Sequence, residues 1–203
     1  MSYSTVSDGS RAQDPRSAAP KMYEEYAYVL DYLPYGRATG DKASRSSSSV
    51  VQIIGETYFT LLEAQLKPGA SAAILERVYI GKDSRDKILR VLGRINYNDL
   101  TATAKAELEN VLEKLILDQE PRFISFFNNS SAVTPRMHSL ELLPGIGKKL
   151  MWQIIGQREK RPFSSFKDFR ERTGITEPIR ILAKRISEEL SGESKYRLFT
   201  RAP

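Results

Sequence analysis

The stretch Leu143-Pro144-Gly145-Ile146-Gly147-Lys148-Lys149 constrains the fold of this chain more than any other part of its sequence. A short segment with apolar residues at helical spacing, Met137 to Leu142, precedes it, and a longer one, Leu150 to Gln157, follows it. Pro144 ends the first segment because it has no N–H to donate and disfavours helical geometry at the residue before it. The pattern predicts two helices joined by a tight glycine turn.

The residues of this turn favour an anion-binding site. Gly145 and Gly147 accept backbone torsions that a side chain resists, and they leave the backbone uncovered. Ile146 is expected to anchor the turn against the two helices. The N–H groups that begin the second helix then lie free beside Lys148 and Lys149, and this arrangement attracts a phosphate. A purely structural turn is the alternative, because tight turns between helices favour glycine in any case.

These residues resemble the helix-hairpin-helix motif, which holds nucleic-acid backbones without reading bases. The run from Leu142 to Ile175 resembles the tandem form of the motif in the DNA-binding end of competence proteins. The second turn of this run is Thr173-Gly174-Ile175-Thr176-Glu177. We expect it to be structural or to bind more weakly, because it has one glycine and Glu177 places negative charge where a phosphate would lie.

A longer stretch carries a closer resemblance. It runs from Phe126-Phe127-Asn128 through Thr134-Pro135-Arg136-Met137-His138-Ser139-Leu140-Glu141-Leu142. It resembles an archaeal family of uncharacterised proteins, domain of unknown function 655, whose members are expected to bind RNA. The likeness covers residues 23–190. It implies an OB-like barrel followed by a helix-hairpin-helix pair, and an RNA-binding protein linked to translation or ribosomal RNA.

Five segments rich in Tyr, Val, Ile and Leu are separated by turn residues and are predicted to be strands. They are 25–33, 50–54, 58–66, 73–80 and 87–95. Short strands of this number favour a small closed barrel, because closure removes exposed edges. Periodicity does not separate an OB-like barrel from an SH3-like one, and the family resemblance favours the OB-like form.

Helical patterns follow the strands. Thr101 is predicted to cap a helix that packs on the barrel, Thr134-Pro135 to begin another, and Ser165 with Asp168 to form the capping box of a third. The predicted fold class is α+β, with a small OB-like β-barrel and attached helix followed by an all-α tandem helix-hairpin-helix domain. The expected divisions are a disordered tail (1–22), the barrel domain (23–133), a helical domain that folds alone (134–190) and a basic tail (191–203).

The charge is distributed unevenly along the chain. The net charge is +6, but residues 23–120 carry 12 Lys/Arg against 15 Asp/Glu, whereas residues 121–203 carry 16 against 8. The basic excess therefore belongs to the part that contains the glycine turns. Such an excess predicts a polyanionic partner, which we expect to be nucleic acid, RNA before DNA.

The residues predicted to contact nucleic acid fall into three groups: the first turn, the end of the helix after it, and a loop of the barrel. They are Gly145, Ile146, Gly147, Lys148 and Lys149; Arg158, Lys160 and Arg161; and Arg37, Lys42 and Arg45. Trp152, the only tryptophan, lies opposite the apolar stripe of its helix. We expect it to dock the helical domain on the barrel, with stacking on a base or ribose as the alternative.

The residue types present exclude several kinds of chemistry. The chain has no cysteine and therefore no disulfides or thiolate sites, and one histidine, His138, cannot form a His-based metal site or triad. We expect His138 to bond a backbone carbonyl. Lys149 and Asp168 have the spacing of the catalytic pair in helix-hairpin-helix DNA glycosylases, but Asp168 has a capping role and strands occupy the N-terminal half. We therefore expect a non-catalytic protein without metal or cofactor.

The remaining expectations concern location and assembly. No apolar run approaches the ~20 residues that span a bilayer, and the N-terminus has no apolar signal-peptide core. We expect a cytoplasmic monomer with no membrane partner. A DNA-structure-binding protein is the alternative function, and a repair enzyme of the glycosylase or nuclease type is a further one.

Overall fold

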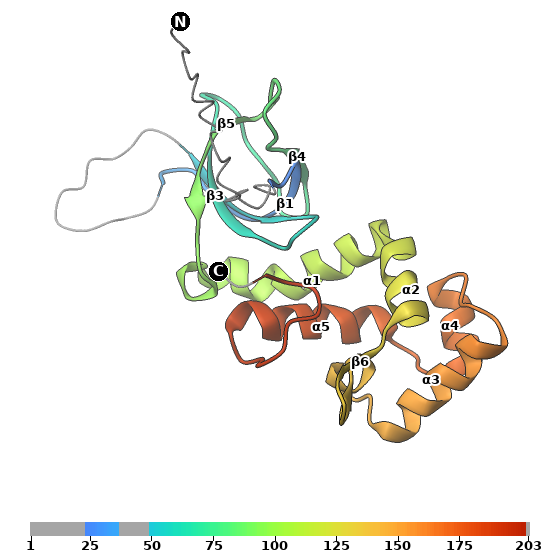
Figure 1. Cartoon of the computed structure of the whole chain (residues 1–203). Coiled ribbons are helices and arrows are strands. Elements are labelled where there is room, and N and C mark those ends of the chain that lie inside the picture. The colour runs from blue at the N-terminus through green and yellow to red at the C-terminus, as the bar shows by residue number, and fades with distance from the viewer. Residues whose placement is uncertain (1–22, 37–48, 202–203) are drawn as a thin grey trace, which may run out of the picture.

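The computed structural model describes residues 23–36 and 49–201, and it places a curled sheet at one end of the molecule and a group of helices at the other (Figure 1). The expected N-terminal tail and the loop with Arg37, Lys42 and Arg45 lie outside the described residues. Five strands overlap the five predicted segments and confirm them. They are β1 (Tyr26–Leu33), β2 (Val50–Gly55), β3 (Leu61–Leu66), β4 (Arg77–Tyr79) and β5 (Ile88–Arg94).

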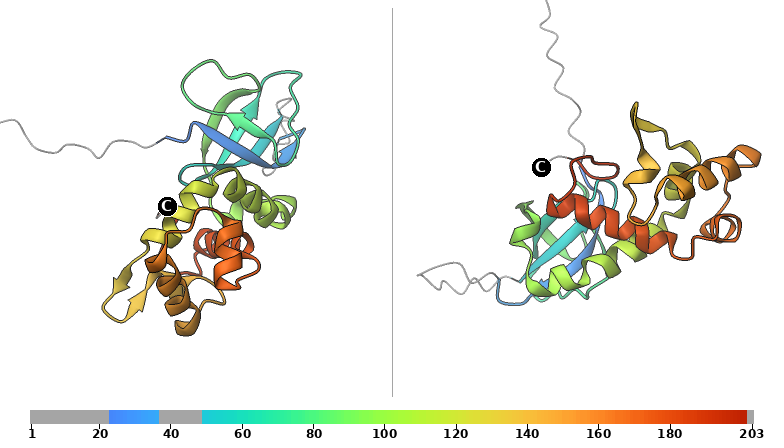
Figure 2. Two further views of the ribbon diagram at one scale, coloured as in Figure 1. Left: turned by 90° about the vertical axis from the view of Figure 1, so that its right-hand side faces the viewer. Right: turned by 90° about the horizontal axis from the view of Figure 1, so that it is seen from below.

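The five strands form one antiparallel sheet in the order β4-β1-β2-β3-β5, which curls into a half-barrel (Figure 2). The central strand β2 is buried along its whole length. Val51 and Ile53 belong to a core inside the curl, whereas Ile54 belongs to a larger core that the sheet shares with the helices. The apolar run of β2 is explained by this position, because a strand covered on both faces has no solvent side.

Helix α1 (Ala102–Asp118) connects the sheet to the helical part of the molecule. Thr101 is its N-cap, as predicted: the hydroxyl accepts a backbone N–H of α1 and donates to the Asp31 carboxylate of β1 at 2.6 Å. At the other end of α1, the Tyr28 hydroxyl donates to Asp118. Burial and the neighbouring carboxylate raise the pKa of Tyr28, so the phenol remains a neutral donor.

The helices that follow share one core with the sheet. They are α2 (Glu120–Asn129), α3 (Lys148–Lys160), α4 (Phe166–Thr173) and α5 (Pro178–Ser191). A 3-10 turn, η1 (Tyr97–Asp99), precedes α1. Helix α5 lies alongside α1 in both figures (Figures 1 and 2). The large core is continuous from Leu30 and Phe59 of the sheet side to Phe169 and Ile186 of the last helices. The expected domain boundary at residue 134 therefore does not coincide with a break in the core.

The predicted helix start at Thr134-Pro135 is wrong. Residues there form a small hairpin, β6 (Ala132–Thr134) and β7 (Met137–His138), and only one 3-10 turn, η2 (Ser139–Leu142), follows. His138 closes that turn, because its Nδ1 accepts the Leu140 N–H and its own N–H is accepted by Glu141. Leu143 before Pro144 is extended, so no second helical turn can form.

The segment after α5 packs on the molecule and is not a free tail. Glu189 is fully buried, and its carboxylate accepts the N–H groups of Leu198, Phe199 and Thr200 and the Thr200 hydroxyl. Arg185, also buried, pairs with Glu189 at 3.0 Å. Residues 192–201 of the predicted basic tail are therefore held against the core by the buried carboxylate of Glu189.

Candidate nucleic-acid interface

The first glycine turn is built by the backbone of residues 143–147. The Ile146 N–H donates to the Leu143 carbonyl at 3.0 Å, and Gly145 has a φ of 79°. A left-handed torsion of this kind favours glycine, as predicted. Gly147 differs, since it is the N-cap of α3 with φ −86° and ψ 179°, torsions that any residue adopts. The expectation that both glycines are needed for their torsions holds for Gly145 only.

The turn presents uncovered backbone to solvent. A Cβ at Gly145 or Gly147 would have nothing within 4 Å, and both residues are exposed, whereas Ile146 is 4% exposed and packs into the large core as predicted. The first N–H groups of any α-helix lack acceptors within the helix. No described side chain caps the start of α3. These amides are therefore free to bind an anion, and the missing side chain at Gly147 leaves room for its approach.

Cationic and aromatic side chains flank these amides. Lys148 and Lys149 are the first two residues of α3 and are exposed. Trp152 follows them by four and three residues, the spacing that places side chains on one helix face. Its side chain is 65% exposed, so the prediction that it docks the helices on the sheet is wrong. The buried stripe of α3 is Met151, Ile154 and Ile155, which directs Trp152 to solvent beside the lysines.

The basic residues at the other end of α3 have different surroundings. Arg158 donates to the Phe127 carbonyl and to both the hydroxyl and carbonyl of Ser130, so its guanidinium joins α3 to the end of α2. Arg161 pairs with Asp168 at 2.9 Å but keeps an exposed side chain. Lys160 is exposed. At about 1.5 Å per residue, this end of α3 lies roughly 18 Å from Lys148, too far for one phosphate to contact both ends.

The second turn has several of its polar groups satisfied internally. Gly174 is the left-handed C-cap of α4, with φ 70°. Its N–H donates to the Arg170 carbonyl, and the Thr173 carbonyl accepts from Gln153 of α3. Helix α5 then begins with Pro178, which has no N–H, and Glu177 precedes it. The turn therefore offers fewer free amides and more negative charge than the first.

A family model, described as "Protein of unknown function (DUF655)", matches residues 23–201. The chain belongs to the DUF655 family. An uncharacterised protein of Methanocaldococcus jannaschii, MJ0038, is 48% identical over 193 residues, which cover 94% of this chain and 86% of that protein. The crystal structure of Af1531 from Archaeoglobus fulgidus, a member of the same family, is similar with a TM-score of 0.81 and 44% identity, and covers 88% of this chain and all of the other.

Two titratable side chains in the helical part of this DUF655 protein, His138 and Asp168, have structural partners. Burial and the charge of Arg158 lower the pKa of His138, whose ring contacts backbone groups of Leu140 and Ser130. Burial acts to raise the pKa of Asp168, but the Ser164 N–H and Arg172 outweigh it, and the pKa lies below its ordinary value. Asp168 thus lies at the start of α4, where its N–H donates to the Ser165 hydroxyl as predicted, but its carboxylate accepts the N–H of Ser164 and not that of Ser165, the partner that a capping box uses.

Among the described residues there is neither a cluster of metal ligands nor a membrane-spanning helix. In residues 23–36 and 49–201, no group of three or more His, Asp or Glu side chains is placed to hold a metal ion. Within the same ranges, no helix is both long and apolar enough to cross a bilayer.

Sequence analysis missed a second basic site. Arg94, Arg197 and Arg201 line one pocket between the sheet and the C-terminal segment. No local signal identifies this group, because more than a hundred residues separate its first member from the others and the packing of residues 192–201 brings them together. The position of Trp152, in contrast, could have been predicted, because its spacing of four and three residues from Lys148 and Lys149 places it on their helix face.

Proposed function

We propose that this DUF655 protein is a non-catalytic nucleic-acid-binding protein that holds a phosphate backbone at the start of α3. The observation that carries the proposal is the exposed, uncapped helix start at Gly147, with Lys148 and Lys149 as its first residues. Backbone amides at a helix N-terminus and adjacent ammonium groups are complementary to a phosphate. The basic excess of residues 121–203 supports a polyanion as the partner.

The contacts divide into three kinds. The amides of the first turn of α3 bind one phosphate, and Gly147 allows the oxygen atoms to approach because it has no side chain. Lys148 and Lys149 neutralise this phosphate and its neighbour. Trp152, exposed on the same helix face, stacks on a base or ribose of the bound strand. Lys160 and Arg161 extend the basic surface to later phosphates, whereas Arg158 is withdrawn from the interface because its guanidinium bonds within the protein.

The fold-level resemblances are consistent with this function. The curled five-stranded sheet supports an OB-like assignment, and the two glycine turns support a tandem helix-hairpin-helix assignment. RNA is the favoured partner, in translation or on ribosomal RNA, because the family resemblance implies it. Phosphates are common to RNA and DNA, so the choice between them depends on groups outside the first turn.

The test is a titration of the full chain with four labelled ligands of equal length: single- and double-stranded RNA and DNA. Binding is followed by fluorescence anisotropy over a range of salt concentrations. We expect the logarithm of affinity to fall with the logarithm of salt by about 0.9 for each phosphate contacted on duplex DNA. Tightest binding to duplex DNA would favour the DNA-structure alternative. Binding that ignores salt would contradict the proposal, and cleavage of abasic or mismatched duplex would indicate a repair enzyme.

A further inference from the structure

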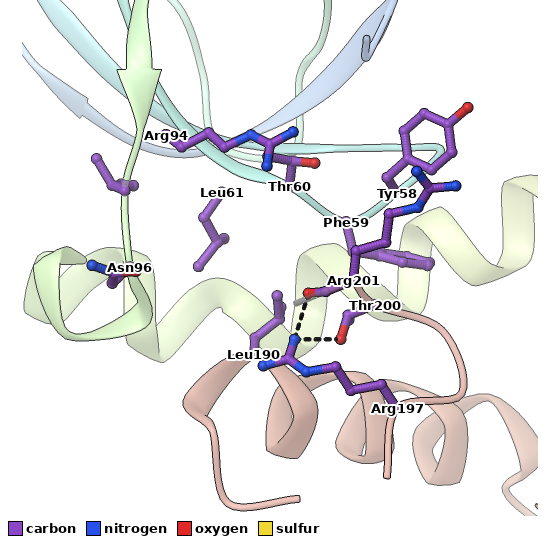
Figure 3. A pocket seen from close by; sticks show the side chains of 11 residues that line it. Tyr58, Phe59, Thr60, Leu61, Arg94, Asn96, Leu190, Arg197, Thr200 and Arg201 are labelled. Carbon is purple, nitrogen blue, oxygen red and sulfur yellow. Dashed lines mark hydrogen bonds between the residues drawn. The ribbon is translucent and has the colours of Figure 1, made fainter. Parts of the chain in front are cut away.

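A pocket lies between the β2–β3 turn, the end of β5 and the C-terminal segment (Figure 3). Its volume is about 320 Å³. Pockets that bind small organic ligands range from about 300 to 1,000 Å³. The pocket therefore has room for one small ligand of nucleotide size. It belongs to the opposite part of the molecule from α3, whose start lies at the far end of the helical group (Figure 1).

The polar lining of the pocket is cationic. Arg94 at the end of β5, and Arg197 and Arg201 of the C-terminal segment, contribute to it, and none of the described lining residues is Asp or Glu. Arg197 donates to the Thr200 hydroxyl at 3.0 Å and to the Arg201 carbonyl, which are neutral acceptors, and no acidic side chain among residues 23–36 and 49–201 pairs with it. Within the described part of the chain, Arg94 has no ion-pair partner. The pocket thus selects for an anion.

The remaining lining is apolar and aromatic. Phe59, Leu61, Ile95 and Leu190 contribute to the pocket, and the guanidinium of Arg201 lies over the Tyr58 ring at 4.5 Å. Figure 3 shows Leu61 between Arg94 on the sheet side and Arg197 on the helix side. An inorganic anion would use only the arginines and leave the apolar part in contact with water. A ligand with a flat apolar part and a phosphate would use both.

The arginines of the C-terminal segment are held in place by a buried carboxylate. Glu189 accepts hydrogen bonds from the backbone of residues 198–200, between Arg197 and Arg201. A buried carboxylate is costly unless it is paired and hydrogen-bonded, and here Arg185 pairs with it. This arrangement orders a segment that would otherwise be a terminal tail. It also fixes two of the three arginines before any ligand arrives, which reduces the entropy lost on binding.

We propose that this pocket binds a nucleoside phosphate, with the arginines on the phosphate and the base against Tyr58 and the apolar residues. Guanidinium groups suit phosphate oxygens because their donors form a planar fork. Aromatic rings and guanidinium planes accept any base by stacking. The ligand is a free nucleotide or an unpaired nucleotide of a strand, since both present this chemistry. The inference does not rest on the proposed function, because the pocket and the start of α3 share no residue.

The experiment measures ligand binding to the full chain by calorimetry. The ligands are adenosine and uridine 5′-monophosphate, the two nucleosides, inorganic phosphate, and single-stranded RNA hexamers. Hexamer titrations use the Lys148→Glu/Lys149→Glu background, which removes binding at the start of α3. The test variant is Arg94→Ala/Arg201→Ala. The control is Arg90→Ala, an exposed arginine of the same strand that bonds Gln65 and does not line the pocket.

We expect the test variant to weaken nucleotide or hexamer binding at least tenfold and the control to change it less than twofold, with unchanged melting temperatures. An effect on the mononucleotides identifies a free nucleotide, and an effect on hexamers alone identifies a strand. Inorganic phosphate or nucleosides that bind as tightly as the monophosphates would overturn the assignment. So would equal binding by the test and control variants, or no binding of either ligand class by the unmodified pocket. None of these results depends on whether α3 binds nucleic acid.

Discussion

The two glycine turns of the helical part look alike in sequence but lead into helices with different surroundings. Helix α3 begins with exposed Lys148 and Lys149, whereas α5 begins with Pro178 and Ile179, which are buried or half-buried. The fifth residue of α3 is Trp152, 65% exposed, and the fifth of α5 is Leu182, fully buried. The first turn thus ends in a solvent-facing surface, and the second directs α5 into the core against α1. A glycine turn indicates a site only when the helix after it leaves its first turn free.

The largest expected effect concerns the segment that carries both turns. A fragment of residues 134–190 is expected not to fold, because α5 loses the face of α1 on which it packs and Glu189 loses residues 198–200. This replaces the sequence-based expectation of an independent domain. Far-ultraviolet circular dichroism during heating checks it. A cooperative melting transition of the fragment would show that the turns form a unit without the sheet side.

Charge reversal tests whether the helix after the first turn contributes more to nucleic-acid affinity than the helix after the second. Lys148→Glu/Lys149→Glu is compared with Arg180→Glu/Lys184→Glu, which makes the same charge change on exposed residues of α5. If the first pair loses two phosphate contacts, affinity at 0.1 M salt falls roughly 50- to 100-fold, since each contact carries about 0.9 of the logarithmic salt slope. The second pair should have a much smaller effect. Equal losses would mean that the protein responds to net charge and has no localised site.

Replacing the glycine of each turn by valine is expected to change the free energy of unfolding by different amounts. Gly174→Val places a β-branched residue at φ 70°, which costs about 1–3 kcal/mol. At position 147 the backbone torsions are ordinary and the space around a side chain is open. Gly147→Val is therefore expected to lower the free energy of unfolding only by about 0.5–1 kcal/mol, because valine is a poorer N-cap. Chemical denaturation measures both. Affinity should change in the reverse order, because only the valine at 147 obstructs free amides. A weaker effect on binding at 147 than at 174, among variants that remain folded, would assign the phosphate to the second turn.

Substitution of the exposed Trp152 is expected to have a smaller effect on affinity, and its fluorescence can report ligand binding. Trp152→Ala is expected to weaken binding about fivefold, at the lower end of the 1–3 kcal/mol that stacking contributes per base. Trp152→Phe should retain most of the affinity, and neither change should alter the free energy of unfolding, because the side chain is largely solvated. As the only tryptophan, it also reports binding through its own fluorescence. Unchanged emission on saturation with ligand would place the strand elsewhere.

The smallest effect is expected from removing negative charge at the second turn. Glu177→Lys eliminates an exposed carboxylate that lies 3.7 Å from Arg180. Surface pairs of this kind contribute about 0–1 kcal/mol, so stability should hardly change. Affinity should rise by less than about threefold. A large increase would indicate that Glu177 alone prevents the second turn from binding phosphate.

Much of the local structure could be predicted because it depends on residues close in sequence. The five strands, the Thr101 cap, the left-handed Gly145 and the Ser165 cap are all determined by nearby residue types. The wrong helix start at Thr134 shows the limit of this reasoning. Thr-Pro is compatible with a helix start and with a hairpin turn, and the outcome depends on His138 closing η2 through its own ring nitrogen.

The roles of individual basic and aromatic residues could not be predicted in the same way. Arg158 and Lys160 look equivalent in sequence, yet only Arg158 meets the carbonyl groups that end α2. Trp152 was expected to dock the helical domain on the barrel, but only the other face of α3 packs into the core. Arg185 is 6% exposed and pairs with Glu189, and no local sequence pattern indicates this burial.

By itself the sequence determined the strands, the helix caps, the glycine turn and the basic excess of the C-terminal part, because torsional preference, capping and net charge depend on local residue types. Only the tertiary structure decided that α5 buries its start against α1, that α3 leaves its lysines and Trp152 in solvent, and that Arg94 meets Arg197 and Arg201. Those outcomes depend on which helix and sheet faces pack into the one continuous core. This packing joins residues that are distant in the chain, so no local sequence pattern predicts it.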